Sequence, residues 1–399
     1  MKKILAMLLA LVMVMGLVAC GSKPAETTAP TETTTPAAES NPVESTPETT
    51  APAVSDVEYK IAMITDYGDI TDQSFNQTTY EACKAFADEN GVPFTYYKPS
   101  GDSTAERVAM VDAAVVDGYN VIVMPGFAFG ETLAEIADIY PEIKFVALDV
   151  ADGEGGFTAT ENVFSAVYQE QLSGYMAGYA AVKLGYKHLG YLGGMAVPAV
   201  QRFGYGFLQG VDAAAKELGI VGDIKVEYVY GNQFFGDADI TAVMDTWYGE
   251  KGVECVFACG GGIFTSAAEA AAKVGGKVIG VDVDQAPVID GLYGEGLTVT
   301  SAMKGLAPTV KTVLSAIVLE NNWAAYAGKI ESLGLVSADP EANYVQIPME
   351  STQWSESFTQ DDYKALVAAM FDGTVVVSDD ISVFPTTEVT VEQYADIKG

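Results

Sequence analysis

From residue 58 onward, short apolar segments alternate with amphipathic ones, and this alternation limits the possible fold more than any other feature of the sequence. The residue pattern predicts strands at 59–64, 94–97, 121–124 and 144–148, and helices at 72–90, 103–116 and 131–139. Ser103 is a candidate N-cap for the second helix, and Asp72 has the same role in the first. Strands that alternate with helices form βαβ units, in which helices cover both faces of a parallel sheet.

The same alternation returns in the second half of the chain. Helices are predicted at 170–184, 199–218, 238–248, 264–274, 307–319 and 360–371, and strands at 189–192, 224–230, 255–258, 277–281, 298–302, 344–347 and 374–377. Two such runs predict an α/β protein with two doubly wound parallel sheets. Because open sheets of this kind bind ligands at the carboxyl ends of their strands, we expect a cleft lined by the polar residues that follow the strands.

The first 55 residues have a different composition. Lys2 and Lys3 precede an apolar run that is short for a membrane span and ends in Leu-Val-Ala-Cys-Gly at 17–21. This pattern resembles a bacterial lipoprotein signal peptide over residues 1–20, which implies cleavage before Cys20 and acyl chains on that residue. An ordinary secretory signal is the alternative. Residues 22–54 contain no aromatic residue and no Leu, Ile or Met, so we predict a disordered linker at 21–55.

Charge and histidine content exclude several classes of function. The formal net charge of −33 would repel phosphate backbones, so a nucleic-acid polymer is not an expected partner. His188 is the single histidine, which excludes HExxH zinc sites and centres with several His ligands. The Asp-Val-Asp segment at 282–284 lacks the remaining ligands of an EF-hand loop. We therefore expect no metal, no cofactor and no enzymatic activity. Cys255 and Cys259 are expected to be small core residues.

The polar segment at 65–77, which follows the first predicted strand, begins Thr-Asp-Tyr-Gly-Asp and continues to Gln-Ser-Phe-Asn-Gln. It resembles the signature of the basic membrane lipoprotein family, the purine-nucleoside-binding branch of the substrate-binding proteins of ABC importers. Further matches follow in the family's order at 125–129, 145–149, 193–198, 230–237, 260–262, 280–285 and 300–304. Each motif is weak alone, but the ordered set is specific and extends over nearly the whole chain after residue 58.

The resemblance implies a type I periplasmic-binding-protein fold, in which two lobes joined by a three-strand hinge close on a nucleoside. The implied lobes are 56–167 with about 304–335, and 168–303 with about 336–399. The crossings are expected near 165–169, 302–305 and 333–340. The resemblance also implies a monomer that is anchored by lipid on the extracytoplasmic face of the cell membrane. Its implied partners are an ABC permease and its ATPase.

Site residues carried over from the family fall on the segments after the strands. Phe75 takes the place of the stacking ring, with Asn76 beside it. Asp66 and Asp149 take the places of the carboxylates at the base edge. The ribose-binding pair falls on two further residues, Asp282 and Lys304.

One segment departs from the family pattern. The family usually has Gly-Ser-Phe-x-Asp where this chain reads Asn-Gln-Phe-Phe-Gly-Asp at 232–237. The spacing to Asp237 favours Phe235 as the second ring, and Phe234 is the alternative. Gly260 and Gly261 would let the backbone approach the sugar closely.

These residue types suit a purine nucleoside. Stacking of a base on an aromatic ring contributes roughly 1–3 kcal/mol, and carboxylates accept hydrogen bonds from base N–H groups and from ribose hydroxyls. The chain contains no GxxxxGK[ST] motif, so a phosphorylated ligand is not expected. The alternatives are a free sugar as the ligand, a nucleoside-cleaving enzyme and a sensor subunit. Arg202 is either a ligand contact or part of a surface ion pair.

Overall fold

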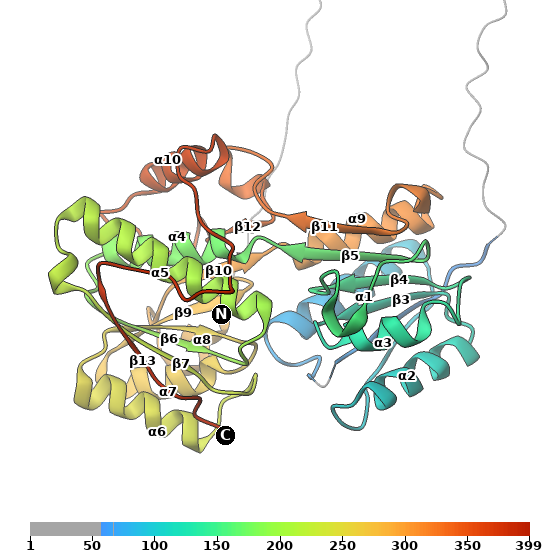
Figure 1. Ribbon diagram of the computed structural model, residues 1–399, viewed down its shortest axis with the longest axis horizontal. Coiled ribbons are helices and arrows are strands. Elements are labelled where there is room, and N and C mark those ends of the chain that lie inside the picture. The colour runs from blue at the N-terminus through green and yellow to red at the C-terminus, as the bar shows by residue number, and fades with distance from the viewer. Residues whose placement is uncertain (1–56, 67) are drawn as a thin grey trace, which may run out of the picture. The chain divides into compact units, whose positions relative to one another are not determined.

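The computed structural model describes residues 57–66 and 68–399 (Figure 1). The predicted signal peptide with Cys20 and the predicted linker at 21–55 lie outside the described residues. In the described part of the chain, strands and helices alternate and form two separate, mainly parallel sheets, which confirms the predicted α/β class. None of the helices in this part combines the length and the apolar character that a membrane span requires.

The first sheet has six parallel strands in the order β11-β5-β4-β3-β1-β2. These strands are β1 (Ile61–Ile64), β2 (Phe94–Tyr97), β3 (Val121–Pro125), β4 (Lys144–Leu148), β5 (Val163–Tyr168) and β11 (Lys329–Leu333). Helices α1 (Phe75–Asn90) and α9 (Leu306–Val318) pack on one face, and α2 (Thr104–Val116) and α3 (Phe129–Ile136) pack on the other. The central strands are buried on both faces, which explains their continuous apolar sequences.

The second sheet has seven strands in the order β12-β10-β9-β8-β6-β7-β13, and all its pairs are parallel except β10 with β12. These strands are β6 (His188–Gly193), β7 (Lys225–Tyr230), β8 (Cys255–Cys259), β9 (Lys277–Asp282), β10 (Thr298–Lys304), β12 (Val345–Gln346) and β13 (Thr390–Gln393). One face carries α4 (Glu170–Lys183), α5 (Pro198–Leu218) and α10 (Gln360–Phe371). The other face carries α6 (Ala238–Thr246), α7 (Phe264–Val274) and α8 (Ala286–Tyr293).

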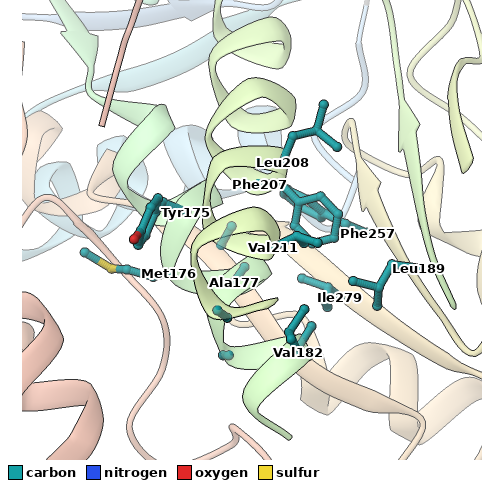
Figure 2. Packing of buried hydrophobic residues seen from close by; sticks show 14 of the residues in the cluster. Tyr175, Met176, Ala177, Val182, Leu189, Phe207, Leu208, Val211, Phe257 and Ile279 are labelled. Atoms are coloured by element: carbon teal, nitrogen blue, oxygen red, sulfur yellow. The ribbon is translucent and has the colours of Figure 1, made fainter. Parts of the chain in front are cut away.

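Helices α4 and α5 lie in close contact over the second sheet, because glycines stand where they meet. A Cβ atom on Gly178 would lie 2.3 Å from the carbonyl oxygen of Phe207, and one on Gly210 would lie 2.1 Å from that of Tyr175. Figure 2 shows apolar side chains of both helices near this contact, together with Phe257 and Ile279 of the sheet. The close packing fixes α4 and α5 against each other, and these helices carry Glu170 and Arg202, two charged residues of the site described below.

The chain passes between the two sheets three times. Gln169 alone connects β5 to α4, and Gly305 alone connects β10 to α9. A longer segment leads from β11 to β12. Lys304 is the last residue of β10 and therefore stands directly at the second crossing.

Several elements differ from the sequence-based predictions. The strand expected at 374–377 does not form, and Val376 is 82% exposed. The free edge of β7 is instead occupied by β13, which was not predicted. Strands β5 and β11 and helix α8 were also missed. The predicted N-cap Ser103 is confirmed, because its side chain accepts a hydrogen bond from the backbone N–H of Glu106.

Candidate functional site

A cavity of about 500 Å³ lies where the carboxyl ends of strands from both sheets meet. Its walls come from the segments that follow β1, β3, β4, β6, β7 and β8, and from the last residues of β9 and β10. All nine site residues named from the sequence line this one cavity: Asp66, Phe75, Asn76, Asp149, Phe235, Gly260, Gly261, Asp282 and Lys304. Their individual roles in binding stay predictions.

Lys304 is the centre of the charged part of the cavity. Its Nζ lies 2.5 Å from Oδ2 of Asp149, 3.6 Å from Oε1 of Glu170 and 3.7 Å from Oδ1 of Asp282. Glu170 is also paired with Arg202, whose Nε donates to Oε2 at 2.6 Å. Three carboxylates therefore share two cations. Arg202 has no place in the cavity wall, so its geometry is that of an ion pair.

Burial and charge act in opposite directions on this cluster. Burial alone would lower the pKa of Lys304, but the carboxylates of Asp149, Asp282 and Glu170 raise it above its ordinary value, so the ammonium stays charged. Burial raises the pKa of Asp282 and of Glu170, although Lys304 counteracts this shift in both residues. The cluster is therefore stable only as a set, since each carboxylate depends on the central cation.

Two of the carboxylates stand on the same unusual backbone conformation. Asp149 directly follows β4 and has a φ of +62°, and Asp282 ends β9 and has a φ of +66°. Residues other than glycine seldom adopt positive φ, although Asp tolerates it better than most. Such backbone strain is typical of functional sites. In each sheet it turns a carboxylate from the end of a strand into the cavity.

Aromatic rings form the apolar part of the wall. Phe75 is the first residue of α1, and Lys304 Nζ lies 4.6 Å from its ring centroid. Phe234 and Phe235 both line the cavity from the loop after β7. Phe235 is 58% exposed, whereas Phe234 is partly buried beside Gly260. Phe127 and Phe203 also line the cavity; both lie in segments that match the family pattern, but neither was named as a site residue from the sequence.

In the described part of the wall, two oxygen atoms are buried without a hydrogen-bond partner. These are Oδ1 of Asn76 and Oδ1 of Asp149. The amide nitrogen of Asn76 is already used, because Nδ2 donates to Oδ2 of Asp72 at 3.1 Å. An unpartnered buried acceptor is costly, by about 1–3 kcal/mol. A ligand that presents N–H or O–H groups at these two positions would remove that cost.

The start of α1 contacts the second sheet directly. Ser74 Oγ donates to Oδ2 of Asp282 at 2.6 Å, and Gln285 Nε2 donates to the carbonyl oxygen of Gln73 at 3.1 Å. The N-cap position of α1 is Ser74 rather than the predicted Asp72, but the Asp72 carboxylate does satisfy the start of the helix, since it accepts from the backbone N–H groups of Ser74, Asn76 and Gln77. Ser74 and Gln285 were missed, because a Ser or Gln beside a helix start is ordinary capping chemistry in a sequence.

The remaining candidates lie away from the cavity or serve the core. His188 Nε2 lies 3.0 Å from Oε1 of Glu227, which makes it a structural imidazole. Cys83, Cys255 and Cys259 are buried free thiols, so the two predicted core cysteines are confirmed. Among residues 57–66 and 68–399, no group of three or more His, Cys, Asp or Glu side chains is arranged to hold a metal ion.

Comparisons with known proteins all point to the same family. A family model described as "ABC transporter substrate-binding protein PnrA-like" matches residues 59–347. The "ABC transporter nucleoside-binding protein BmpA" of Lactococcus lactis is 30% identical over 57% of this chain and 64% of its own length. "Basic membrane protein B" of Borreliella afzelii is 26% identical over 69% of this chain and 78% of its own length. The match to the Lactococcus protein thus spans less than two thirds of that relative.

Solved structures agree on the fold. A solute-binding protein of an ABC transporter system from Aeropyrum pernix superposes with a TM-score of 0.62 at 24% identity, over 81% of this chain and 88% of that protein. A second, from Conexibacter woesei, gives a TM-score of 0.60 at 19% identity over 80% of this chain and 99% of that protein. At such identities the likeness concerns the fold alone.

Proposed function

The chain belongs to the PnrA-like family of ABC transporter substrate-binding proteins, and from this premise we propose that its cavity binds a purine nucleoside. The family consists of binding proteins rather than enzymes, in agreement with the expectation from the sequence. Proteins of this family capture a small ligand and work with a permease and an ATPase. The proposal concerns the identity of that ligand and the way in which it is held.

The observation that carries the proposal is that aromatic rings and carboxylates line one and the same cavity. The cavity volume of about 500 Å³ lies within the 300–1,000 Å³ usual for small-molecule sites. Phe75 would stack on one face of the base, and Phe235 or Phe234 on the other. Each ring would contribute roughly 1–3 kcal/mol. Asp282 and Lys304, which end β9 and β10, would hold the pentose.

The polar atoms of the wall favour donors on the ligand. The unpartnered oxygens of Asn76 and Asp149 require N–H or O–H groups, which a purine edge and ribose hydroxyls supply. Asp282 would accept from the vicinal hydroxyls, and Lys304 would hold Asp282 ionised and donate to a sugar oxygen. Asp66 would accept from the base edge. Gly261, with a φ of +52°, would bring the backbone close to the sugar.

A nucleoside phosphate fits this wall poorly. Among the described residues, the cavity is lined by the carboxylates of Asp66, Asp69, Asp72, Asp149 and Asp282, against the single cation of Lys304. That cation is already engaged by carboxylates. A phosphate group would therefore meet repulsion, so we expect the protein to discriminate against nucleotides.

Closure of two lobes around the ligand is part of the proposal. The lobes would comprise 56–167 with about 304–335, and 168–303 with about 336–399, and would move about the three crossings. The contacts of Ser74 and Gln285 across the sheets would stabilise the closed state. An acylated Cys20 and the linker at 21–55 would tether the lobes to the extracytoplasmic face of the membrane, where the monomer would meet its permease.

Titration calorimetry with the purified full chain tests the ligand class. The panel is inosine, guanosine, adenosine, ribose and inosine 5′-monophosphate, with the exposed variant Asp88→Asn as a matched control for surface charge. We expect at least one purine nucleoside to bind much more tightly than ribose and than the monophosphate. If ribose bound tightly and the nucleosides gave no binding signal, the protein would be a sugar receptor instead. Release of free base from inosine would show an enzyme.

A further inference from the structure

The segment beyond the family match reaches the aromatic loop of the cavity, residues 232–237. The family model matches residues up to 347, and the chain then continues through α10 to β13 on the second sheet (Figure 1). Strand β13 pairs in parallel with β7, with Thr390 opposite Lys225 and Gln393 opposite Tyr228. The loop that carries Phe234 and Phe235 begins where β7 ends.

Backbone hydrogen bonds extend this pairing beyond β13 to the start of the loop. The N–H of Tyr394 donates to the carbonyl oxygen of Tyr228 at 2.9 Å, and the N–H of Ile397 donates to that of Tyr230 at 2.9 Å. The chain therefore follows β7 to its last residue and places Lys398 beside Asn232.

Lys398 contacts both ends of the loop. Its carbonyl oxygen accepts from Nδ2 of Asn232 at 3.1 Å, and its Nζ lies 2.7 Å from Oδ2 of Asp237 and 2.5 Å from Oδ2 of Asp239. Asn232 has a φ of +59°, a conformation that Asn adopts more readily than most residues. Inside the loop, Gln233 Nε2 donates to Oδ2 of Asp237 and to the carbonyl oxygen of Phe235. One residue thus bridges the two ends of a loop whose middle carries both rings.

The terminal segment is itself well anchored before it reaches Lys398. The hydroxyl of Tyr394 donates to the carboxylate of Glu227, which is fully buried. Lys225 Nζ lies 2.8 Å from Oε1 of Glu227 and 2.7 Å from Oε2 of Glu392. Because the segment is fixed by these side chains and by strand pairing, Lys398 has a defined position from which to hold the loop.

We propose that Lys398 is a positioning residue, which clamps residues 232–237 and so sets Phe234 and Phe235 for the ligand. This inference rests on the proposed function in one respect, since the rings matter only if a ligand stacks on them. The clamp itself is a property of the free protein. Without it the loop would sample more conformations, and binding would have to order it at an entropic cost.

Hydrogen exchange on the full chain tests the clamp without any ligand. The comparison is Lys398→Ala against Lys398→Arg, which keeps the charge, and against Lys273→Ala. Lys273 is a matched control, because it also bridges two carboxylates, Asp245 and Glu269, on helices of the same sheet. We expect amide exchange at 232–237 to rise about threefold or more in Lys398→Ala alone, with Lys398→Arg close to the wild type. Unchanged exchange in Lys398→Ala would overturn the proposal.

Calorimetry with inosine tests the consequence for binding. We expect Lys398→Ala to weaken binding about two- to fivefold, which is the range that a partly exposed charged contact can supply. The effect should shrink when Phe234→Ala and Phe235→Ala are both also present, because the clamp then has no ring to position. The proposal would be contradicted if Lys398→Ala lost the same affinity for inosine with and without the two Phe→Ala changes. It would also be contradicted if Lys273→Ala lost as much affinity as Lys398→Ala. If the wild-type protein binds no nucleoside, the proposed function fails. The hydrogen-exchange comparison at 232–237 would still test the clamp, because it needs no ligand.

Discussion

Replacement of Lys304 by Met is the most demanding test of the charged cluster. Met keeps a long apolar side chain and removes only the ammonium group. The Lys304 side chain is 3% exposed, so water cannot take over its role. The variant would leave Asp149, Glu170 and Asp282 facing one another, with Arg202 as the one remaining cation of the cluster.

The magnitude follows from the distances. At an effective dielectric constant of about 20, charges at 2.5 Å attract by about 7 kcal/mol, and those at 3.6 and 3.7 Å by about 5 kcal/mol each. Most of this gross attraction offsets the cost of removing the charges from water. Removal of one partner from a buried ionic group therefore costs about 3–5 kcal/mol rather than the sum. We expect that loss in the free energy of unfolding of Lys304→Met at neutral pH.

The loss should depend on pH in a defined direction. Burial raises the pKa of Glu170 and of Asp282, and Lys304 opposes this rise. Without Lys304 both pKa values should rise further in the folded state. A group whose pKa is higher in the folded than in the unfolded state stabilises the fold at low pH, and this contribution is lost as the pH rises through the folded pKa. The deficit of the variant should therefore be largest at neutral pH and shrink towards pH 4.

Urea unfolding of wild type and variant at pH 5 and pH 7.5 measures this difference. The exposed ion pair of Lys84 with Asp88 supplies the control, and Lys84→Met should leave unfolding unchanged at both pH values. A deficit of less than about 1 kcal/mol at pH 7.5 would refute the reasoning, since it is well below the range for a buried partner. A deficit of equal size at both pH values would refute the assignment of the loss to carboxylate repulsion.

Three further substitutions address the ligand, the ring and the fold. Asp282→Ala should weaken nucleoside binding by about 2–3 kcal/mol through lost charge-assisted hydrogen bonds; unchanged affinity in calorimetry would remove Asp282 from the ribose site. Phe75→Ala should weaken binding by roughly 1–3 kcal/mol, and Phe75→Tyr should retain most of the affinity; equal losses in both variants would argue against stacking. Gly178→Val should lower the free energy of unfolding by several kcal/mol, because a Cβ there would lie 2.3 Å from the Phe207 carbonyl oxygen. Thermal unfolding checks this value, and Gly222→Val, at a position with open space around it, is the control.

The strands that the sequence predicts well are those buried on both faces. The four residues of β1 and the five of β8 are wholly buried, and their apolar sequences mark them directly. Edge strands lack this signal, because one side and often one face meets solvent. Lys329–Leu333 and Thr390–Gln393 contain more charged or polar residues than apolar ones, and their strand state depends on pairing with β5 and β7. The run at 374–377 has strand propensity, but β13 rather than this run pairs with the edge of β7.

The candidate site shows a similar division between what a sequence reveals and what only a structure reveals. Residues that directly follow buried strands, such as Asp66 and Asp149, could be placed at the cavity by topology alone. Glu170 and Gln285 could not, since each belongs to a helix start where polar residues are common. Their positions depend on how α4 and α8 pack on the second sheet. Phe203 likewise occurs within an apolar helix face, where its sequence is typical of core packing.

The backbone strain and the charges in the cavity would favour closure of the two lobes on a bound ligand. Two aspartates hold positive φ angles, two buried acceptors have no partner, and three carboxylates share Lys304 and Arg202. Each of these features raises the free energy of the protein without a ligand, and a donor-rich ligand would relieve the unpartnered acceptors first. Both acceptors lie on the side of the first sheet, in α1 and directly after β4, whereas Asp282 ends β9 of the second sheet, so a ligand held by the acceptors would reach Asp282 as well only in the closed state. The atoms that recognise the ligand would then also stabilise the closed state relative to the open one.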